Sequence, residues 1–259
     1  MIKKIILIIT IIITSSASQI EPTVINISFK NKDNYPYVIG EGKAILSVNP
    51  GVAIDTIHSI EKKLNIKFIV SRDSWLRQKR KLQYNKIDML FSASYKKSRK
   101  NIGIYPTYEN GLLNDTKKII SSSYVVYKLK ESKLDWDGKV FSNLTGKLIT
   151  QKGYSIVSFL KNKGVDALEN RTDTDIENLL AKRVEGVARH SDTYDQYFKL
   201  NPKIAEKIVK LPIPLKSKGY YLLASKEFYK NNPSLVNKIW DELSNIDKSN
   251  KFKYIRDKY

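Results

Sequence analysis

One stretch of the sequence, residues 88–106 (DMLFSASYKKSRKNIGIYP), places hydroxyl groups and an arginine directly after an apolar run. The run from Met89 to Phe91 has the composition of a buried strand, and Ser92 and Ser94 follow it. Arg99 lies five residues beyond Ser94, and a guanidinium group suits two parallel hydrogen bonds to a carboxylate. The stretch is therefore either the end of a strand that opens onto a binding cleft or a solvated loop in a lysine-rich protein.

The elements around this stretch alternate between strand and helix. The periodicity of apolar residues predicts strands at 23–29, 66–70 and 87–93 and helices within 49–65 and 74–87. A strand-helix-strand-helix-strand order implies a parallel sheet that is covered by helices. In such sheets ligands bind beyond the carboxyl ends of the strands, which is where Ser92 and Ser94 fall.

The same kind of pattern then restarts, which predicts a second α/β unit. Its predicted strands lie at 146–153, 184–190 and 206–214, its helices at 154–164, 172–183 and 191–202, and a terminal helical segment at 232–259. Two extended segments, 121–128 and 215–225, join the two units. A second unit inserted between parts of the first gives a hinged molecule in which two lobes enclose a cleft.

The first eighteen residues predict a cleavable signal peptide. Lys3 and Lys4 form a positive start, Ile5 to Ile13 form a short apolar core, and small residues at 16–18 suit cleavage. An apolar core of about ten residues is well short of the roughly 20 that a membrane-spanning helix needs, so we favour a signal over an anchor. We therefore expect a periplasmic protein.

The composition excludes several kinds of site. The chain has no cysteine, which excludes disulfides, a thiol nucleophile and thiolate metal ligands. With His58 and His190 as its only histidines, it does not favour a histidine-rich metal site, and we expect no metal and no cofactor. Export without disulfides fits a bacterial periplasm.

The formal net charge is +20, from 46 basic and 26 acidic residues. Such a balance can indicate a nucleic-acid partner, but the lysines are spread along the whole chain, with no arginine-rich arm and no nucleic-acid-binding module. We expect a solvated basic surface and no nucleic-acid partner. The sequence also lacks the serine-hydrolase, metalloprotease and phosphate-loop motifs, which favours a protein that is not an enzyme.

Four segments, in this order along the chain, resemble the bacterial extracellular solute-binding proteins of family 3, the amino-acid-type periplasmic binding proteins. They are residues 49–70, 74–111, 136–164 and 176–194. The resemblance implies an α/β, two-lobed fold of the periplasmic-binding-protein type II, or Venus flytrap, with two hinge crossovers. With the signal peptide at 1–18, lobe 1 would comprise 19–123 and 217–259, and lobe 2 would comprise 124–216.

The resemblance also implies which residues meet the ligand in lobe 1. The strand end at Ser92 to Ser94 would face the ligand, and Arg99 would hold a ligand carboxylate through a bidentate ion pair. Either Tyr35 or Tyr37 matches the place of an aromatic side chain that packs on the ligand.

In lobe 2 the resemblance points to a turn and to the end of a strand. The turn 151–155 (QKGYS) would offer backbone N–H groups, the Ser155 hydroxyl and the neighbouring Tyr154. His190 stands at or beside the position where the family has an acidic residue that receives the ligand's amino group, and Asp192 would substitute for it. A lysine at 96 also stands where the family usually has a threonine.

The resemblance implies a monomeric binding protein that captures a small polar ligand with a carboxylate group. Its partner would be an ABC permease or a membrane sensor. Two alternatives stay open: a cleft enzyme on the same fold, such as a dehydratase, and a degenerate member that binds a protein or an anionic envelope polymer.

Overall fold

The computed structural model describes residues 21–172, 174–247, 254–255 and 257–259. The predicted signal peptide, residues 1–18, lies outside the described residues. Within the described part of the chain, no helix combines the length and the apolar character needed to cross a membrane.

The first unit has the predicted strand-helix order and a parallel sheet. Its elements are β1 (Thr23–Lys30), α1 (Val52–Leu64), β2 (Ile66–Asp73), α2 (Trp75–Gln83) and β3 (Met89–Ser94). Strands β2 and β3 both pair with β1 in parallel, so all three carboxyl ends lie at one edge of the sheet. The predicted parallel sheet is therefore confirmed for this half of the molecule.

Local sequence explains where the first two helices begin and end. Helix α1 buries Ile54, Ile57 and Ile60 on one face, and Asn65 ends it in the left-handed conformation with φ of 49°. Ser74 occupies the N-cap position of α2, and its hydroxyl makes no capping hydrogen bond.

The second unit is built from shorter elements. They are β5 (Asp135–Trp136), β6 (Phe141–Ser142), β7 (Leu148–Gln151), α3 (Ile156–Asn162), β8 (Ala167–Asn170), α4 (Asp175–Leu180), β9 (Gly186–His190), α5 (Ser191–Leu200), α6 (Pro202–Ala205) and β10 (Ile208–Lys210). Strands β8 and β9 both pair with β7 in parallel. Strand β8 was not predicted, because its four residues (ALEN) are too few to show a strand pattern.

Two long antiparallel strands, β4 (Ile120–Leu129) and β11 (Lys216–Ala224), cross between the units. Strand β11 pairs with β3 at one end, and β4 pairs with β9 at the other, so one continuous sheet runs through both units in the order β2-β1-β3-β11-β4-β9-β7-β8. The predicted crossing segments thus correspond to these two strands.

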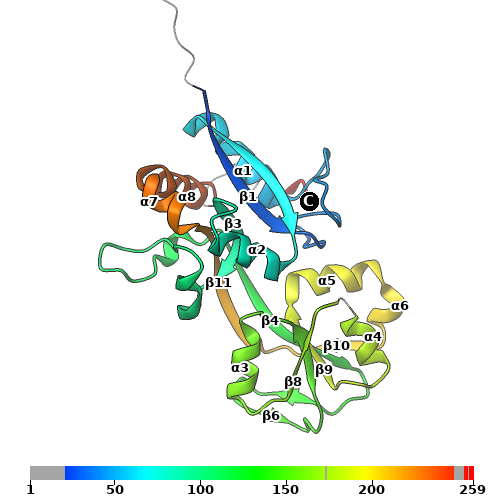
Figure 1. Ribbon diagram of the computed structural model, residues 1–259. Helices are drawn as coiled ribbons and strands as arrows, with labels where there is room; N and C mark the ends of the chain where they lie inside the picture. The colour runs from blue at the N-terminus through cyan, green and yellow to red at the C-terminus, as the bar shows by residue number, and fades with distance from the viewer. Residues whose placement is uncertain (1–20, 173, 248–253, 256) are drawn as a thin grey trace, which may run out of the picture.

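The chain returns to the first unit in two helices, α7 (Lys226–Asn231) and α8 (Pro233–Asp247), which lie beside α1 in Figure 1. We call the part with β1–β3, α1, α2, α7 and α8 lobe 1, and the part with β5–β10 and α3–α6 lobe 2. Each lobe has a hydrophobic core on both faces of its sheet segment, as expected when helices cover parallel strands. The strand ends that face the other lobe are left to form a site.

Candidate functional site

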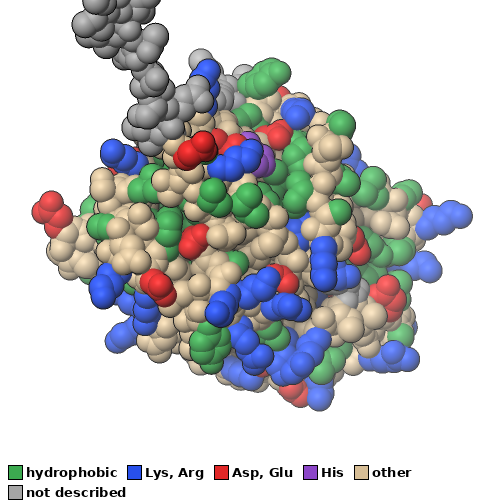
Figure 2. All heavy atoms as spheres, turned by 45° about the horizontal axis from the view of Figure 1, so that its top comes forward, with side chains coloured by type: hydrophobic (Ala, Val, Ile, Leu, Met, Phe, Trp, Pro, Cys, Tyr) green, Lys and Arg blue, Asp and Glu red, His purple; other side chains and the backbone are tan. Residues whose placement is uncertain are grey.

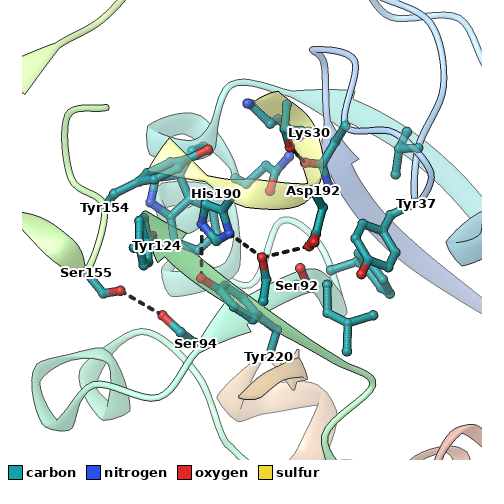
Figure 3. Close-up of a pocket in the computed structure, with 18 of the residues that line it drawn as sticks. Lys30, Tyr37, Ser92, Ser94, Tyr124, Tyr154, Ser155, His190, Asp192 and Tyr220 are labelled. Carbon is teal, nitrogen blue, oxygen red and sulfur yellow. Dashed lines mark hydrogen bonds between the residues drawn. The ribbon is translucent and has the colours of Figure 1, made fainter. Parts of the chain in front are cut away.

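A cavity of about 80 Å³ lies between the lobes and is lined in part by the crossing strands (Figure 3). Both lobes and both crossing strands contribute side chains to its wall. The lining residues are Lys30, Asn34, Tyr37, Val38, Trp75, Gln78, Phe91, Ser92, Ser94, Arg99, Ile120, Ser122, Tyr124, Tyr154, Ser155, His190, Asp192, Thr193 and Tyr220. Most of the wall is therefore aromatic or hydroxyl-bearing, and its charged members are Lys30, Arg99 and Asp192.

Arg99 is held in place by the end of β3. It belongs to a 3₁₀ turn, η1 (Lys97–Asn101), and its side chain is only 7% exposed. Its Nη1 donates to the carbonyl oxygen and the hydroxyl of Ser94, at 2.8 and 2.9 Å, and its Nη2 donates to the carbonyl of Gly153 at 3.4 Å. Of the five guanidinium N–H groups, these bonds leave the Nε hydrogen and one Nη2 hydrogen for a ligand.

The two lobes touch through polar contacts at the rim of the cavity. Ser94 of lobe 1 and Ser155 of lobe 2 form a hydroxyl-to-hydroxyl hydrogen bond of 3.2 Å. Thr193 donates to the side-chain oxygen of Asn34 at 3.0 Å, on the other side of the cavity. These contacts describe lobes that are closed on one another, which accounts for the small volume of the cavity.

Trp75 covers the seam beside Arg99. Its indole nitrogen donates to the Gly153 carbonyl at 3.3 Å, and the Arg99 guanidinium carbon lies 5.0 Å from its ring centre. A guanidinium group over an indole face is a favourable cation–π contact. The same Gly153 carbonyl accepts from both side chains, so it joins the clamp of lobe 1 to the turn of lobe 2.

His190 lies at the centre of a hydrogen-bond chain on the floor of the cavity. Its Nε2 is 3.0 Å from the Tyr220 hydroxyl, and its Nδ1 is 2.9 Å from the Ser122 hydroxyl. Ser122 donates to the Asp192 carboxylate at 2.8 Å. Since a carboxylate only accepts, the single Ser122 hydrogen goes to Asp192 and the Nδ1 of His190 carries the hydrogen that Ser122 accepts. The histidine is then neutral, and its Nε2 accepts from Tyr220.

The surroundings of His190 explain this neutral form. Tyrosine rings enclose it, with the centre of the Tyr124 ring 4.2 Å away and that of Tyr220 5.3 Å away. Burial among these rings, together with the positive charges of Lys30, Arg189 and Lys218, lowers the pKa of His190 to about 3. Burial also raises the pKa of Tyr124 to about 12, so both groups are uncharged at neutral pH.

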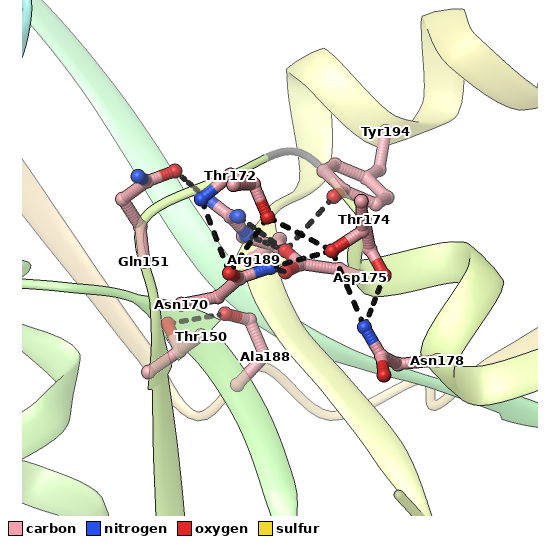
Figure 4. Close-up of polar contacts among 10 residues, drawn as sticks. All are labelled: Thr150, Gln151, Asn170, Thr172, Thr174, Asp175, Asn178, Ala188, Arg189 and Tyr194. Atoms are coloured by element: carbon pink, nitrogen blue, oxygen red, sulfur yellow. Dashed lines mark hydrogen bonds and ion pairs between the residues drawn. The ribbon is translucent and has the colours of Figure 1, made fainter. Parts of the chain in front are cut away.

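A buried ion pair supports the lobe 2 wall from behind (Figure 4). Asp175, with no exposed surface, accepts from the Nε of Arg189 and from the Tyr194 hydroxyl, the last at 3.1 Å, and forms an ion pair with the Nη2 of Arg189. Arg189 donates to Gln151 at 2.7 Å, and its guanidinium carbon lies 5.8 Å from the Tyr154 ring centre. The pair therefore fixes the end of β7 and one aromatic wall of the cavity.

The structure brings most of the predicted site residues to this cavity. Those that line it are Ser92, Ser94, Arg99, Tyr37, Tyr154, Ser155, His190 and Asp192. Tyr35 is not among the lining residues, because the turn closed by the Tyr37 N–H and the Asn34 carbonyl, at 2.8 Å, brings Tyr37 rather than Tyr35 to the wall. Asp192 does face the cavity, although Ser122 already occupies one of its oxygens.

Sequence reasoning missed the contribution of the crossing strands. Ser122 and Tyr124 point into the cavity from β4, and Tyr220 does so from β11. The signal was present in the predicted crossing segment, since side chains two apart in a strand share one face. Lys30, at the end of β1, was also missed.

The family model for bacterial extracellular solute-binding proteins, family 3, matches residues 31–259. A match over that much of the sequence shows that the chain belongs to this family. The architecture described above, two α/β lobes with a cavity between them, is the one predicted from the resemblance to this family. A search of curated proteins found no match.

Solved structures share the fold at low sequence identity. The GluR0 ligand-binding core from Nostoc punctiforme, in complex with L-glutamate, aligns with a TM-score of 0.67 and 16% identity over 92% of this chain and 99% of that one. An ancestral arginine-binding protein bound to arginine gives 0.69 and 18% over 92% and 99%. An ABC uptake transporter substrate-binding protein from Streptococcus pneumoniae, with bound histidine, gives 0.68 and 18% over 91% and 92%. At these identities the likeness establishes the type II periplasmic-binding-protein fold.

Proposed function

We propose that this protein is a periplasmic solute-binding protein that captures a small, amino-acid-like ligand through its carboxylate and delivers it to an ABC permease or a membrane sensor. The observation that carries the proposal is the convergence of Arg99 and Ser94 from lobe 1 with Ser155 from lobe 2 on one cavity. A bound carboxylate would accept from the free Arg99 donors while the serine hydroxyls reorient toward it.

The distal end of the ligand would meet the opposite wall. Asp192 keeps a carboxylate in the cavity, and such a group suits an amino or other cationic group of a ligand. Tyr37 and Tyr154 would pack on the part of the ligand between the two polar ends. The similar structures described above bind glutamate, arginine and histidine, which supports an amino acid as the class to test first.

We propose that residues 19–123 and 217–259 act as one lobe and residues 124–216 as the other, and that ligand binding closes them about β4 and β11. We expect the first eighteen residues to be removed on export and the mature protein to act as a monomer. In this scheme the ligand acts by binding the closed arrangement more tightly than an open one.

A histidine is the commonest general base in enzymes, and His190 is the histidine that lines the cavity. Because its pKa is lowered to about 3, His190 is a weak base at neutral pH and is poorly matched to that task. A role in binding a protein or an anionic polymer would instead use the basic surface, and Figure 2 shows Lys and Arg side chains spread over the visible face with acidic ones among them. The polymer-binding alternative makes no use of the convergence of the two lobes on one cavity.

The test is calorimetric titration of the purified protein with single amino acids and small carboxylates, beside mass spectrometry of any molecule that co-purifies. We expect Arg99→Ala to lower the affinity for the best ligand by at least tenfold. Arg99→Lys, which keeps the charge but loses the bidentate geometry, should recover only part of it. Undiminished affinity in Arg99→Ala would refute the carboxylate clamp, and chemical conversion of the ligand would favour the enzyme.

A further inference from the structure

A second cavity, of about 310 Å³, lies on the other side of Arg99 from the candidate ligand site. Lobe 1 contributes Lys79 from α2 and Lys96 from the residue before η1, and lobe 2 contributes Ser158 from α3. We call this space the outer groove. It is open to solvent along the seam between the lobes, and nothing in the proposed ligand-binding role requires it.

The outer groove carries an excess of positive charge. Within the part of the chain that the structure describes, no carboxylate forms an ion pair with Lys79, Lys96 or Arg99. The groove contains one acidic residue, Glu169, and its carboxylate is already engaged by the Lys161 ammonium at 3.2 Å and the Gly153 N–H at 3.3 Å. Two lysines and an arginine thus share a confined space without a neutralising partner.

Lys79, Lys96 and Arg99 lie close enough for their charges to affect the pKa of Lys79. Desolvation, followed by the charges of Arg99 and Lys96, lowers the pKa of Lys79. The Lys79 ammonium lies 5.4 Å from the ring centre of Trp75, which also receives the Arg99 guanidinium at 5.0 Å. Like charges held around one indole ring repel one another, and a bound anion would relieve that repulsion.

The donors of the groove come from three separate elements. Lys96 donates to the Ser158 hydroxyl at 2.8 Å across the seam, which leaves two ammonium hydrogens and the serine hydrogen for another acceptor. Lys79 approaches from α2, near Gly153. Donors from three directions suit the tetrahedral arrangement of oxygens in phosphate or sulfate better than the two coplanar oxygens of a carboxylate.

We propose that the outer groove is a second anion-binding site that takes a small tetrahedral oxyanion, phosphate or sulfate, between Lys79 and Lys96 of lobe 1 and Ser158 of lobe 2. An anion held by both lobes stabilises their closed arrangement, since it would lose one set of donors when they part. The site is independent of the proposed ligand function, because it requires neither the free Arg99 donors nor the inner cavity.

The test is calorimetric titration of the purified protein at pH 7.5 with sodium phosphate and with sodium sulfate, against sodium chloride at equal ionic strength. We expect saturable binding of both oxyanions and none of chloride. Lys79→Gln and Lys96→Gln should each weaken phosphate binding by about tenfold, as expected for loss of a charge-assisted contact of about 1.4 kcal/mol. A crystal grown with phosphate should place the anion between Lys79 and Ser158.

Lys97→Gln is the matched control, because it removes the same charge one residue away on an exposed side chain that does not line the groove. It should leave phosphate affinity within about twofold, as expected for an exposed charge that is screened by salt. An equal loss in Lys97→Gln, or a phosphate signal that does not saturate, would overturn the site. If Lys79→Gln still binds the amino acid as the unmodified protein does, the proposed ligand function stands even where the anion site fails.

Discussion

The Tyr220 hydroxyl and the Nε2 of His190 lie 3.0 Å apart, and they join a crossing strand to the end of a lobe 2 strand. The other ring nitrogen of His190 is bonded to Ser122, on the second crossing strand. In the neutral ring Nδ1 donates to Ser122 and Nε2 accepts from Tyr220, whereas in a protonated ring both nitrogens would be donors and the Tyr220 hydroxyl would have to turn its own hydrogen away. The chain of bonds ties the floor of the cavity to the two strands about which the lobes would close.

The free energy of unfolding should therefore fall at acid pH, because His190 binds a proton more readily in the unfolded chain. Its pKa is near 6.5 when unfolded and about 3 when folded, so the unfolded chain binds more protons between these values. The contribution is fully present above about pH 6.5 and is lost as the pH falls toward 3. Urea denaturation at pH 7.5, 5.5 and 4 measures this slope, which should be smaller in His190→Gln. A histidine NMR titration that shows His190 protonated at pH 5.5 would contradict the prediction.

Ser122→Ala should destabilise the protein by about 1–3 kcal/mol, because it removes the donor to Asp192 and the acceptor for His190 in an enclosed site. Ser123→Ala is the matched control. Ser123 lies in the same strand as Ser122 but on an exposed face, where its hydroxyl is hydrogen-bonded to that of Ser217 at 2.7 Å. The substitution should lower the free energy of unfolding by less than about 0.5 kcal/mol. Chemical denaturation of the two variants gives the comparison, and equal losses would argue against the hydrogen-bond chain.

Breaking the buried pair behind the cavity should be more costly. Asp175→Ala leaves the Arg189 guanidinium buried without its partner, and we expect a loss of about 3–5 kcal/mol in the free energy of unfolding. Asp166→Ala breaks the exposed ion pair with Lys147 and should cost less than about 1 kcal/mol. Denaturation curves of the two variants measure both losses. A small loss in Asp175→Ala would mean that the buried pair contributes little to stability.

Trp75 should report lobe movement by its fluorescence. Its indole nitrogen bonds to Gly153 across the seam, whereas Trp136 and Trp240 lie in the hydrophobic cores of single lobes. A ligand that changes the distance between the lobes should change the tryptophan emission. This change should be absent from Trp75→Phe and present in Trp136→Phe. A change retained in Trp75→Phe would place the reporter elsewhere.

Gly153→Ala should reduce ligand affinity as well as stability. Both Gly153 and Gly164 have positive φ, 76° and 73°, so an alanine at either position should cost about 1–2 kcal/mol of backbone strain. Only at Gly153 would the new methyl group meet lobe 1, at 3.1 Å from Leu76 and 3.3 Å from the Lys79 ammonium. Titration of both variants with the ligand should therefore show weaker binding only for Gly153→Ala, and equal affinities would contradict a steric effect on closure.

The order of elements could be predicted because long amphipathic helices and apolar strands have clear periods. Ile54, Ile57 and Ile60 repeat at helical spacing and are buried on one face of α1. Strand β8 could not be predicted, since it has only four residues, 167–170, two apolar and two polar, which pair through tertiary contact with β7. The conformation of such a short segment is determined by the residues that pack against it and pair with it.

The candidate site could be predicted where it coincides with strand ends and turns. Ser94, Arg99 and Ser155 follow elements whose positions are evident from the sequence, and they meet at one cavity. The bonds of Tyr220 to His190 and of Ser122 to Asp192 could not be predicted, because they join residues 30 and 70 positions apart. Such pairs depend on the register between β4 and its neighbours.

Strands β4 and β11 are hydrogen-bonded to each other where they pass between the lobes, with Ser121 opposite Gly219. Deleting a single residue from either strand would shift one lobe by about 3.3 Å against the other and turn every following side chain to the opposite face. Ser122 and Tyr124 would then leave the cavity wall. We therefore expect insertions and deletions to be tolerated in the exposed hairpin at 107–113 and not in either crossing strand. A change in the length of one crossing strand would require the same change in the other.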